Sequence, residues 1–116
     1  MHKFKELKVW QKAMDLTEEI YACTSNLPDI ERFTLLVQVR RCAVSVPSNI
    51  AEGAGRNSKG EFIQFLGIAN GSVYELQTQI ELLKRLKYID IVTYDRLDVA
   101  SEEIQKMIYK LIQSLK

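Results

Sequence analysis

The sequence predicts an all-α protein, an up-down-up-down antiparallel four-helix bundle. Four stretches place apolar residues three or four positions apart, which is the spacing of one buried helix face. The links between these stretches are short and rich in Ser, Asn, Pro and Gly, as turns between neighbouring helices are. The alternation of apolar and polar residues that indicates a half-buried strand is missing from the sequence.

Length and composition agree with a single domain over residues 1–116. A chain of 116 residues can bury one core but is too short for two. Its 47% apolar and 27% charged residues are ordinary for a globular domain. An apolar run of the ~18 residues that a membrane span needs is absent, so we expect a cytoplasmic protein with no membrane partner.

The first predicted helix begins at about Lys8, after a short basic lead-in, and ends near Thr24. Turn residues follow up to Pro28, and Leu27 between them is expected to pack back onto the core. The apolar stripe of this helix consists of Val9, Trp10, Ala13, Leu16, Ile20, Tyr21 and Cys23.

The second predicted helix, with Asp29 as its N-cap and residues 33–54 as its periodic stretch, is unusually apolar. At 100° per residue, its apolar and small residues cover about 220° of the circumference, roughly twice what a surface helix of a bundle needs. Such a helix must be buried on more than one side. In a chain this short, we expect the extra side to contact another copy of the protein.

Pro47 lies inside this second helix and removes the hydrogen bond to the Ala43 carbonyl, which normally costs about 3 kcal/mol. The chain can either break there into two short helices or continue as one long helix kinked at Pro47. The unbroken apolar pattern favours the kinked helix, with the hydroxyls of Ser45 and Ser48 available to satisfy a freed backbone group.

The third predicted helix starts at Ser58, because Glu61 follows three residues later in the spacing of a capping box, and its stripe reaches residue 86 or 87. Gly67 and Gly71 lie one turn apart in it, and each costs the helix up to about 1 kcal/mol, so a compensating close contact is expected. Tyr88 to Asp90 close this helix, and the fourth predicted helix has its stripe from residue 91 to 115.

The residues that carry catalysis are scarce. The only histidine is His2, at the terminus, and Glu-x-x-His pairs of the di-iron kind are absent. Gly53-x-Gly55 follows a helix and lacks the lysine of a phosphate loop. Glu52 and Glu75 could meet across the second and third helices, but such a pair is more often a structural ion-pair network. We therefore predict no catalytic residue, metal or cofactor, and no enzyme.

The charge and the cysteines give little sign of a partner. Sixteen Lys and Arg against fifteen Asp and Glu leave a net charge of +1, so nucleic-acid binding would need a local patch or a ring made by oligomerisation. The most basic local stretch is N-terminal, with Lys3, Lys5, Lys8 and Lys12 against Glu6. Cys23 and Cys42 lack ligand spacing and are expected to be small buried residues in a reducing compartment.

A polar ridge on the second helix is the most informative feature. It can be a solvated face, a polar seam between subunits, or a contact with a ligand or nucleic acid. Short Ser and Asn are less usual than Lys and Glu on a solvated face, and buried polar ridges most often specify assembly, so we favour the seam. The ridge consists of Gln38, Arg41, Ser45, Ser48, Asn49 and Glu52. The predicted subunit interface comprises Arg41, Ser45, Ser48, Asn49, Glu52, Gly67, Gly71 and Glu75.

Three segments resemble the four-helix-bundle family of 23S ribosomal RNA intervening-sequence proteins. They are F-x-x-L-x-V-W-Q-K-A at residues 4–13, Q-V-R-R-C-A-V-S-V-P-S-N-I-A-E-G at 38–53, and E-F-I-Q-F-L-G-I-A-N-G-S-V-Y-E-L-Q-T-Q at 61–79. The resemblance implies barrel-like homopentamers of antiparallel bundles, with the family's proline at Pro47 inside a continuous helix. Relatives include the accessory protein of diversity-generating retroelements, which is basic and binds nucleic acid and a reverse transcriptase.

Two functions follow as expectations. The first is a non-enzymatic oligomer, a pentamer by resemblance, that associates with structured RNA or DNA through phosphate contacts. The second is an oligomeric scaffold or adaptor whose partner is another protein. The predicted nucleic-acid contacts are Arg40, Arg41, Arg56, Lys59, Lys8 and Lys12.

Overall fold

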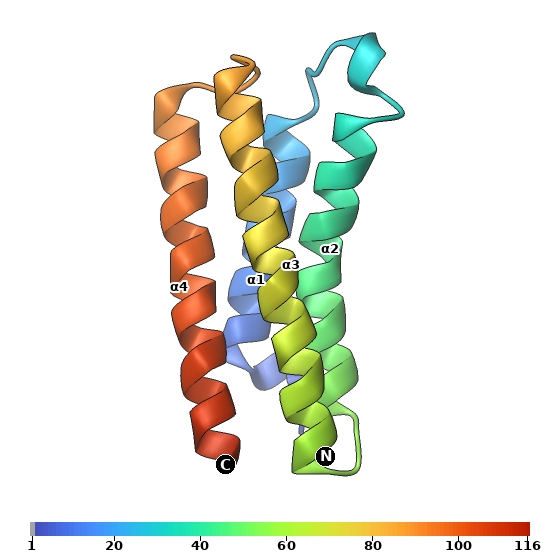
Figure 1. Cartoon of the computed structure of the whole chain (residues 1–116), viewed down its shortest axis with the longest axis vertical. Helices are drawn as coiled ribbons and strands as arrows, with labels where there is room; N and C mark the ends of the chain where they lie inside the picture. The colour runs from blue at the N-terminus through green and yellow to red at the C-terminus, as the bar shows by residue number, and fades with distance from the viewer. Residues whose placement is uncertain (1) are drawn as a thin grey trace.

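The computed structural model describes residues 2–116, which form four α-helices and two short 3-10 turns (Figure 1). Met1, the first residue of the predicted lead-in, lies outside the described residues. The four-helix architecture confirms the predicted fold class. The helices are α1 (Lys8–Cys23), α2 (Leu35–Ala54), α3 (Lys59–Arg85) and α4 (Ile91–Leu115), and the turns are η1 (Phe4–Glu6) and η2 (Asp29–Glu31).

Successive helices run in opposite directions (Figure 1). Between α1 and α4, Lys12 pairs with Glu103 at 3.2 Å and Glu19 pairs with Arg96 at 3.3 Å, so residue numbers rise along one helix as they fall along the other. One end of the bundle therefore holds the N-terminal segment from His2 on, the C-terminus and the α2–α3 connection, and we call it the terminal end. The opposite end, with η2 and the α3–α4 connection, is the loop end.

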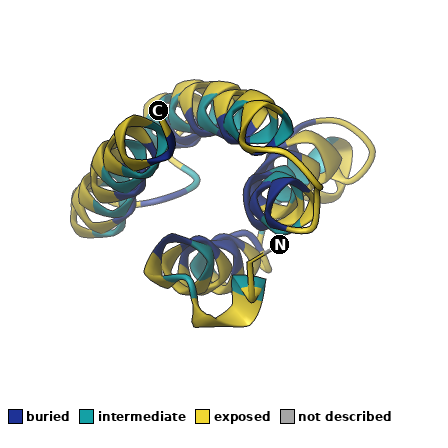
Figure 2. Ribbon diagram, turned by 90° about the horizontal axis from the view of Figure 1, so that it is seen from below, coloured by how far each residue is buried: buried dark blue, intermediate teal, exposed yellow. Residues whose placement is uncertain are grey.

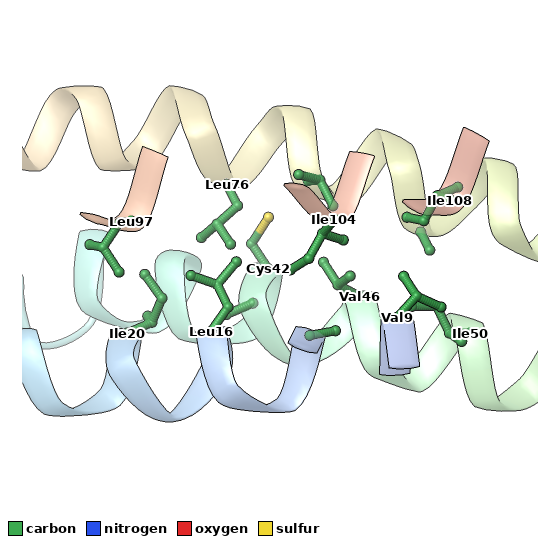
Figure 3. Packing of buried hydrophobic residues seen from close by; sticks show 14 of the residues in the cluster. Val9, Leu16, Ile20, Cys42, Val46, Ile50, Leu76, Leu97, Ile104 and Ile108 are labelled. Carbon is green, nitrogen blue, oxygen red and sulfur yellow. The ribbon is translucent and has the colours of Figure 1, made fainter. Parts of the chain in front are cut away.

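The inward stripes of all four helices form one apolar core (Figure 2). Side chains from different helices meet along the whole axis, for example Leu16 of α1, Val46 of α2 and Ile104 of α4 (Figure 3). Burying one such aliphatic side chain stabilises the fold by about 1.5–3 kcal/mol. The largest fully buried side chains are Phe62, Ile20, Ile50, Leu66, Leu76, Ile80, Leu83, Leu97, Ile104, Ile108, Val39 and Val46.

The start of α2 differs from the prediction. Asp29 begins the separate turn η2 and is not the N-cap of α2, which starts only at Leu35. The chain turns once after Pro28 and again before the helix, and the Thr34 hydroxyl donates a 2.7 Å hydrogen bond back to the Glu31 carboxylate. The expectation that Leu27 packs back onto the core is confirmed.

Pro47 lies inside one uninterrupted helix, as the apolar pattern predicted. The group that satisfies the freed Ala43 carbonyl was not foreseen: the Thr17 hydroxyl of α1 lies 3.1 Å from that oxygen. Ser45 and Ser48, the predicted donors, do not bond the Ala43 carbonyl. The Ser45 hydroxyl bonds that of Ser72 in α3, and Ser48 is exposed. The kink itself stays a prediction.

Local capping signals define the later helices. Ser58 is the N-cap of α3: its hydroxyl oxygen accepts the Glu61 backbone N–H at 3.2 Å and lies 3.1 Å from the Glu61 carboxylate. Asp90, predicted to close the third helix, is instead the N-cap of α4, and its side chain accepts the Thr93 N–H at 2.8 Å. Lys87 adopts a left-handed φ of 64° in the connection, which turns the chain between the two helices.

Candidate functional site

The terminal end of the bundle is basic although the chain as a whole is nearly neutral. Within residues 2–116, the part of the bundle between the Lys12–Glu103 pair and the terminal end holds eight basic side chains and three acidic ones. The basic residues are Lys3, Lys5, Lys8, Arg56, Lys59, Lys106, Lys110 and Lys116, and the acidic residues are Glu6, Glu52 and Glu61. The rest of the chain therefore carries an excess of acid.

Arg56 engages two of those three acids. Its guanidinium lies 2.8 Å from the Glu52 carboxylate and 3.8 Å from that of Glu61, and it stacks over the Phe65 ring at 4.7 Å. Among the described residues, the lysines of the terminal end make no ion pair within 4 Å. Their ammonium groups are therefore available to an anionic partner.

The N-terminal segment is attached beside the start of α3. The His2 backbone N–H donates a 2.9 Å hydrogen bond to the Ala54 carbonyl, and the His2 ring packs against Phe62 at 4.9 Å. His2, Phe62 and the residues from Arg56 to Lys59 line a hollow of about 240 Å³. Lys3 and Lys5 are thereby held at the same end as Lys59.

The structure divides the predicted nucleic-acid contacts into two groups. Lys8, Arg56 and Lys59 share the terminal end. Lys12 is paired with Glu103, and Arg41 lies exposed on α2 toward the other end. Arg40 is also distant from the terminal end, and its guanidinium serves the fold.

Arg40 fastens α2 to the end of α1. Its guanidinium donates to the Thr24 hydroxyl at 3.0 Å and to the Tyr21 carbonyl at 3.2 Å, and it lies over the Tyr21 ring at 4.5 Å. These contacts give Arg40 a structural role between the two helices.

Sequence reasoning missed three basic residues of this end: Lys106, Lys110 and Lys116 of the α4 segment. They are far from Lys3 and Lys59 in the chain, so no window of sequence groups them. The predicted up-down-up-down topology contained the signal, because it places the end of the fourth helix beside the start of the first.

A polar groove of about 350 Å³ runs between α2 and α3. Its floor is fixed by two contacts: the Ser45 hydroxyl donates to that of Ser72, and the Cys42 thiol lies 3.2 Å from the Ser72 carbonyl. The lining residues are Gln38, Arg41, Cys42, Ser45, Ser72, Glu75 and Gln79.

Several polar groups of this groove lack a partner within residues 2–116. Arg41 and Glu75 are exposed, and within residues 2–116 neither makes an ion pair within 4 Å. The buried Oε1 of Gln79 has no hydrogen-bond donor among those residues. Burial raises the pKa of the Cys42 thiol to about 11, with the nearby Glu75 carboxylate adding to the effect. Cys42 is thus a neutral thiol at physiological pH.

The other predicted interface residues lie along the same face or beside it. The Asn49 amide donates to the Ser45 carbonyl at 2.8 Å, while Ser48 is exposed. Gly67 and Gly71 are exposed on α3, and a Cβ placed on either would meet nothing within 4 Å. The expected close contact at these glycines is therefore not made within residues 2–116.

Glu52 and Glu75 do not meet, contrary to the possibility that the sequence suggested. The antiparallel register places Gly53 beside Phe65 and Cys42 beside Glu75, so the two carboxylates lie at different heights. Glu52 is bonded to Arg56 instead. Glu52 and Glu75 are therefore too far apart along the bundle to act together as a general acid–base pair.

The excess apolar surface of α2 is partly covered by its own chain. α1 packs on one side of α2 and α3 on the other, with the core between them (Figure 2). What stays uncovered is a strip with Val37 and Val44, each 39% exposed. This strip lies next to Arg41, at the edge of the polar groove.

Two further observations concern metal binding and membrane crossing. Within the described residues, clusters of three or more His, Cys, Asp or Glu side chains able to hold a metal ion do not occur. Over the same residues, every helix falls short of the length and apolar content that crossing a membrane requires.

Comparison with known proteins agrees with this architecture. Residues 5–110 match the 23S rRNA-intervening sequence protein family. The chain is similar to a protein of unknown function from the S23 ribosomal protein family of Bacteroides thetaiotaomicron VPI-5482, whose crystal structure superimposes with a TM-score of 0.83. That match has 28% identity and covers 90% of this chain and 95% of the other. None of the curated proteins with which the chain was compared matches it.

Proposed function

Because the chain belongs to the 23S rRNA-intervening sequence protein family, we propose that it is a non-enzymatic protein that works as an assembly of copies and associates with structured nucleic acid. The contacts are made to phosphates by the terminal end of the bundle. The assembly is a homopentamer, as the resemblance of the sequence implies.

The excess of basic side chains at the terminal end is the observation that carries this proposal. Phosphate contacts need ammonium or guanidinium groups that are free of other partners, and Lys3, Lys8 and Lys59 meet that condition. The acidic excess of the remaining bundle repels a polyanion from its sides. A nucleic acid would therefore approach along the bundle axis.

Assembly strengthens such binding. If several copies present their terminal ends on one side, a single nucleic acid contacts several basic surfaces, and the later contacts form at high effective concentration. A near-neutral chain can then bind a polyanion without the high overall charge of a typical nucleic-acid module.

Fluorescence anisotropy with a labelled RNA hairpin, measured over a series of salt concentrations, tests the proposal. The double variant Lys8→Gln, Lys59→Gln should bind more weakly, and the slope of log affinity against log salt should fall by about two, close to one per lost phosphate contact.

The matched control is Arg32→Gln, Lys87→Gln, which removes the same charge at the loop end. It should leave affinity and slope nearly unchanged. Absence of binding by the wild type at low ionic strength, or equal effects of the two double variants, would contradict the proposal.

A protein partner is the second candidate function, and one observation favours it. The loop end exposes Ile30 and Phe33, which are 81% and 82% exposed, and Ile91 and Val92 are exposed in the first turn of α4 at the same end. Ile30 and Phe33 lie three residues apart in one short connection, and exposed apolar side chains of this size are typical of protein–protein contacts. Calorimetric titration with the purified product of an adjacent gene tests this function, and Ile30→Ser, Phe33→Ser should abolish the heat of binding.

A further inference from the structure

Two of the five tyrosines differ from the other three in their surroundings. Tyr21, Tyr88 and Tyr94 each contact a charged side chain of another segment, through the ring or through the hydroxyl. Tyr74 of α3 and Tyr109 of α4 are 59% and 64% exposed, and within residues 2–116 neither hydroxyl makes a hydrogen bond. The packing of the bundle therefore leaves most of these two rings uncovered.

Both rings lie along the line of contact between α3 and α4, which pack side by side (Figure 1). Across this line the Gln105 amide donates a 2.7 Å hydrogen bond to the Gln77 side chain. Tyr74 comes three residues before Gln77, and Tyr109 comes four residues after Gln105. Because the two helices are antiparallel, both tyrosines lie about one turn from that bond, on the side of the terminal end. We call Tyr74 and Tyr109 the aromatic pair.

The surface around the aromatic pair is cationic and free of acidic side chains. α4 has three lysines and no Asp or Glu over residues 104–116, and α3 has no charged side chain over residues 62–74. Lys106 and Lys110 are exposed and come three residues before and one residue after Tyr109. Both lysines belong to the basic terminal end. An anion can therefore reach the Tyr109 ring beside two free ammonium groups.

The acidic side chains of the two helices resume toward the loop end, at Glu75 and Glu103. Glu75 lies on the side of α2, where its carboxylate is 3.9 Å from the Cys42 thiol, and Glu103 is paired with Lys12. The acid-free surface thus begins at the aromatic pair and continues to the terminal end. An anionic chain that covers the two rings is directed from them toward that end.

We propose that unpaired nucleotides of the bound nucleic acid stack on Tyr74 and Tyr109, while Lys106 and Lys110 contact the phosphates beside them. This inference rests on the proposed function and specifies which part of a structured nucleic acid the protein contacts. In a duplex each base is covered by its neighbours, whereas the bases of loops and single-stranded ends offer a free face to an aromatic ring. Exposed aromatic rings next to lysines are the means by which proteins hold single strands without reading their sequence.

The composition of this surface favours a nucleic acid over a protein partner. The centre of a protein–protein interface is depleted of lysine. Over residues 104–116 of this chain the exposed side chains are three lysines, Gln113, Ser114 and Tyr109, with no aliphatic residue among them. A protein partner would find little apolar surface there beyond one ring, whereas a nucleotide uses both the ring and the ammonium groups.

Fluorescence anisotropy with two labelled RNA duplexes tests the inference. One duplex carries a single-stranded overhang and the other has blunt ends. The wild type should bind the overhang duplex more tightly. Tyr74→Ala and Tyr109→Ala should each weaken that binding about tenfold and leave binding to the blunt duplex nearly unchanged. The slope of log affinity against log salt should stay constant in both variants, because no phosphate contact is lost.

Three further proteins serve as controls. Tyr109→Phe keeps the ring and should bind the overhang duplex almost as the wild type does. Phe33→Ala removes an exposed ring at the loop end and should change neither affinity. The double variant Lys106→Gln, Lys110→Gln should weaken binding to the overhang duplex and lower the salt slope by about two, which the tyrosine variants do not do. Circular dichroism confirms that each variant is folded.

The same two duplexes made of DNA form a second arm. Stacking uses the flat face that every base has, so the preference for the overhang and its loss in Tyr109→Ala should both reappear there. A tyrosine effect restricted to RNA would assign the contact to the sugar hydroxyl and overturn stacking as its cause.

The outcomes separate this inference from the proposed function. If the wild type binds none of the duplexes at low ionic strength, the proposed function fails and the inference fails with it. Equal binding of the overhang and blunt duplexes, with both tyrosine variants unchanged, overturns the inference alone. If the tyrosine variants lose a protein partner but bind RNA as the wild type does, the aromatic pair belongs to a protein contact, and the inference is likewise overturned.

Discussion

The Thr17 hydroxyl of α1 lies 3.1 Å from the Ala43 carbonyl of α2, the oxygen that loses its helical donor because Pro47 has no N–H. The same hydroxyl lies 2.8 Å from the Ala13 carbonyl of its own helix, so its single proton is shared between two acceptors. Thr17 is buried. The proline in α2 is thus tolerated partly because a neighbouring helix supplies a replacement donor.

Removal of this hydroxyl should destabilise the fold. Thr17→Val keeps the shape of the side chain and leaves the Ala43 carbonyl without a partner, at an expected cost of about 1–3 kcal/mol. Pro47→Ala returns a backbone N–H to the same carbonyl. Thr17→Val should therefore cost less in the Pro47→Ala background, and urea unfolding of the four proteins measures the coupling. Additive effects would show that Thr17 does not replace the missing donor.

The glycines of the bundle should respond in opposite ways to alanine. At Gly53 a Cβ would lie 2.7 Å from the Phe65 Cβ and 3.0 Å from a Phe62 ring carbon, so Gly53→Ala should lower stability by about 1–3 kcal/mol through overpacking. At Gly67 the new Cβ meets open space, so Gly67→Ala should raise the stability of the folded chain by up to about 1 kcal/mol. Thermal unfolding at low protein concentration compares the two, and equal shifts would contradict this packing.

Glu81 should make stability depend on acid pH. The Tyr94 hydroxyl donates to its carboxylate at 2.8 Å and Arg85 at 3.0 Å, and these bonds lower the pKa of Glu81 from 4.5 to about 2. The folded state thus favours the carboxylate, so this contribution is complete above pH 4.5 and is lost as the pH falls toward 2. Tyr94→Phe should raise the pKa of Glu81, which carbon-detected NMR titration measures directly. An unchanged pKa of Glu81 in the Tyr94→Phe variant would contradict the hydrogen bond between the two residues.

Tyr94, the donor in the hydrogen bond to Glu81, should ionise only at high pH. The hydrogen bond to Glu81 raises the pKa of Tyr94 to about 12, because it favours the protonated phenol. The contribution of Tyr94 to stability is therefore present below pH 10 and declines between pH 10 and 12. The hydrogen bond to the Glu31 carboxylate also raises the pKa of Tyr88, so ultraviolet titration of tyrosinate should show late ionisation of both residues. Only the Tyr94 step should move to lower pH in the Glu81→Gln variant.

Cys42 should be chemically inert in the folded protein. With a pKa of about 11, the thiolate fraction at pH 8 is on the order of 10⁻³. In a Cys23→Ser background, reaction with a disulfide reagent should be slow until the protein unfolds. Adding Glu75→Gln removes the neighbouring negative charge, so the pKa of Cys42 should fall and the native-state reaction should accelerate. A native rate equal to the unfolded rate would contradict the burial of the thiol.

Features encoded by neighbouring residues were predictable from the sequence. Ser58 and Glu61 lie three positions apart and define the start of α3 as expected, and the stripe around Leu16 and Ile20 is buried. The periodicity across Pro47 indicated a continuous helix, which the structure contains. In each case the physical cause acts within one or two helical turns.

Features that depend on distant residues escaped prediction. Thr17 and Ala43 are separated by the whole α1–α2 connection, so the sequence offered nearby serines as donors instead. Asp29 has the composition of an N-cap, but the turn after Pro28 leads the chain away before α2 begins. The basic terminal end combines residues from both ends of the chain, which the up-down-up-down topology brings together and which no local window of sequence contains.

The separation of acid from base along the bundle axis gives the molecule a large electric dipole moment, which its isoelectric point does not reveal. Exchanging Lys59 with Glu18 would leave the isoelectric point almost unchanged while weakening the dipole. On a cation-exchange column the protein should be retained near neutral pH and should adsorb with its termini toward the resin. Overall charge is therefore a poor guide to how this molecule orients near a charged surface.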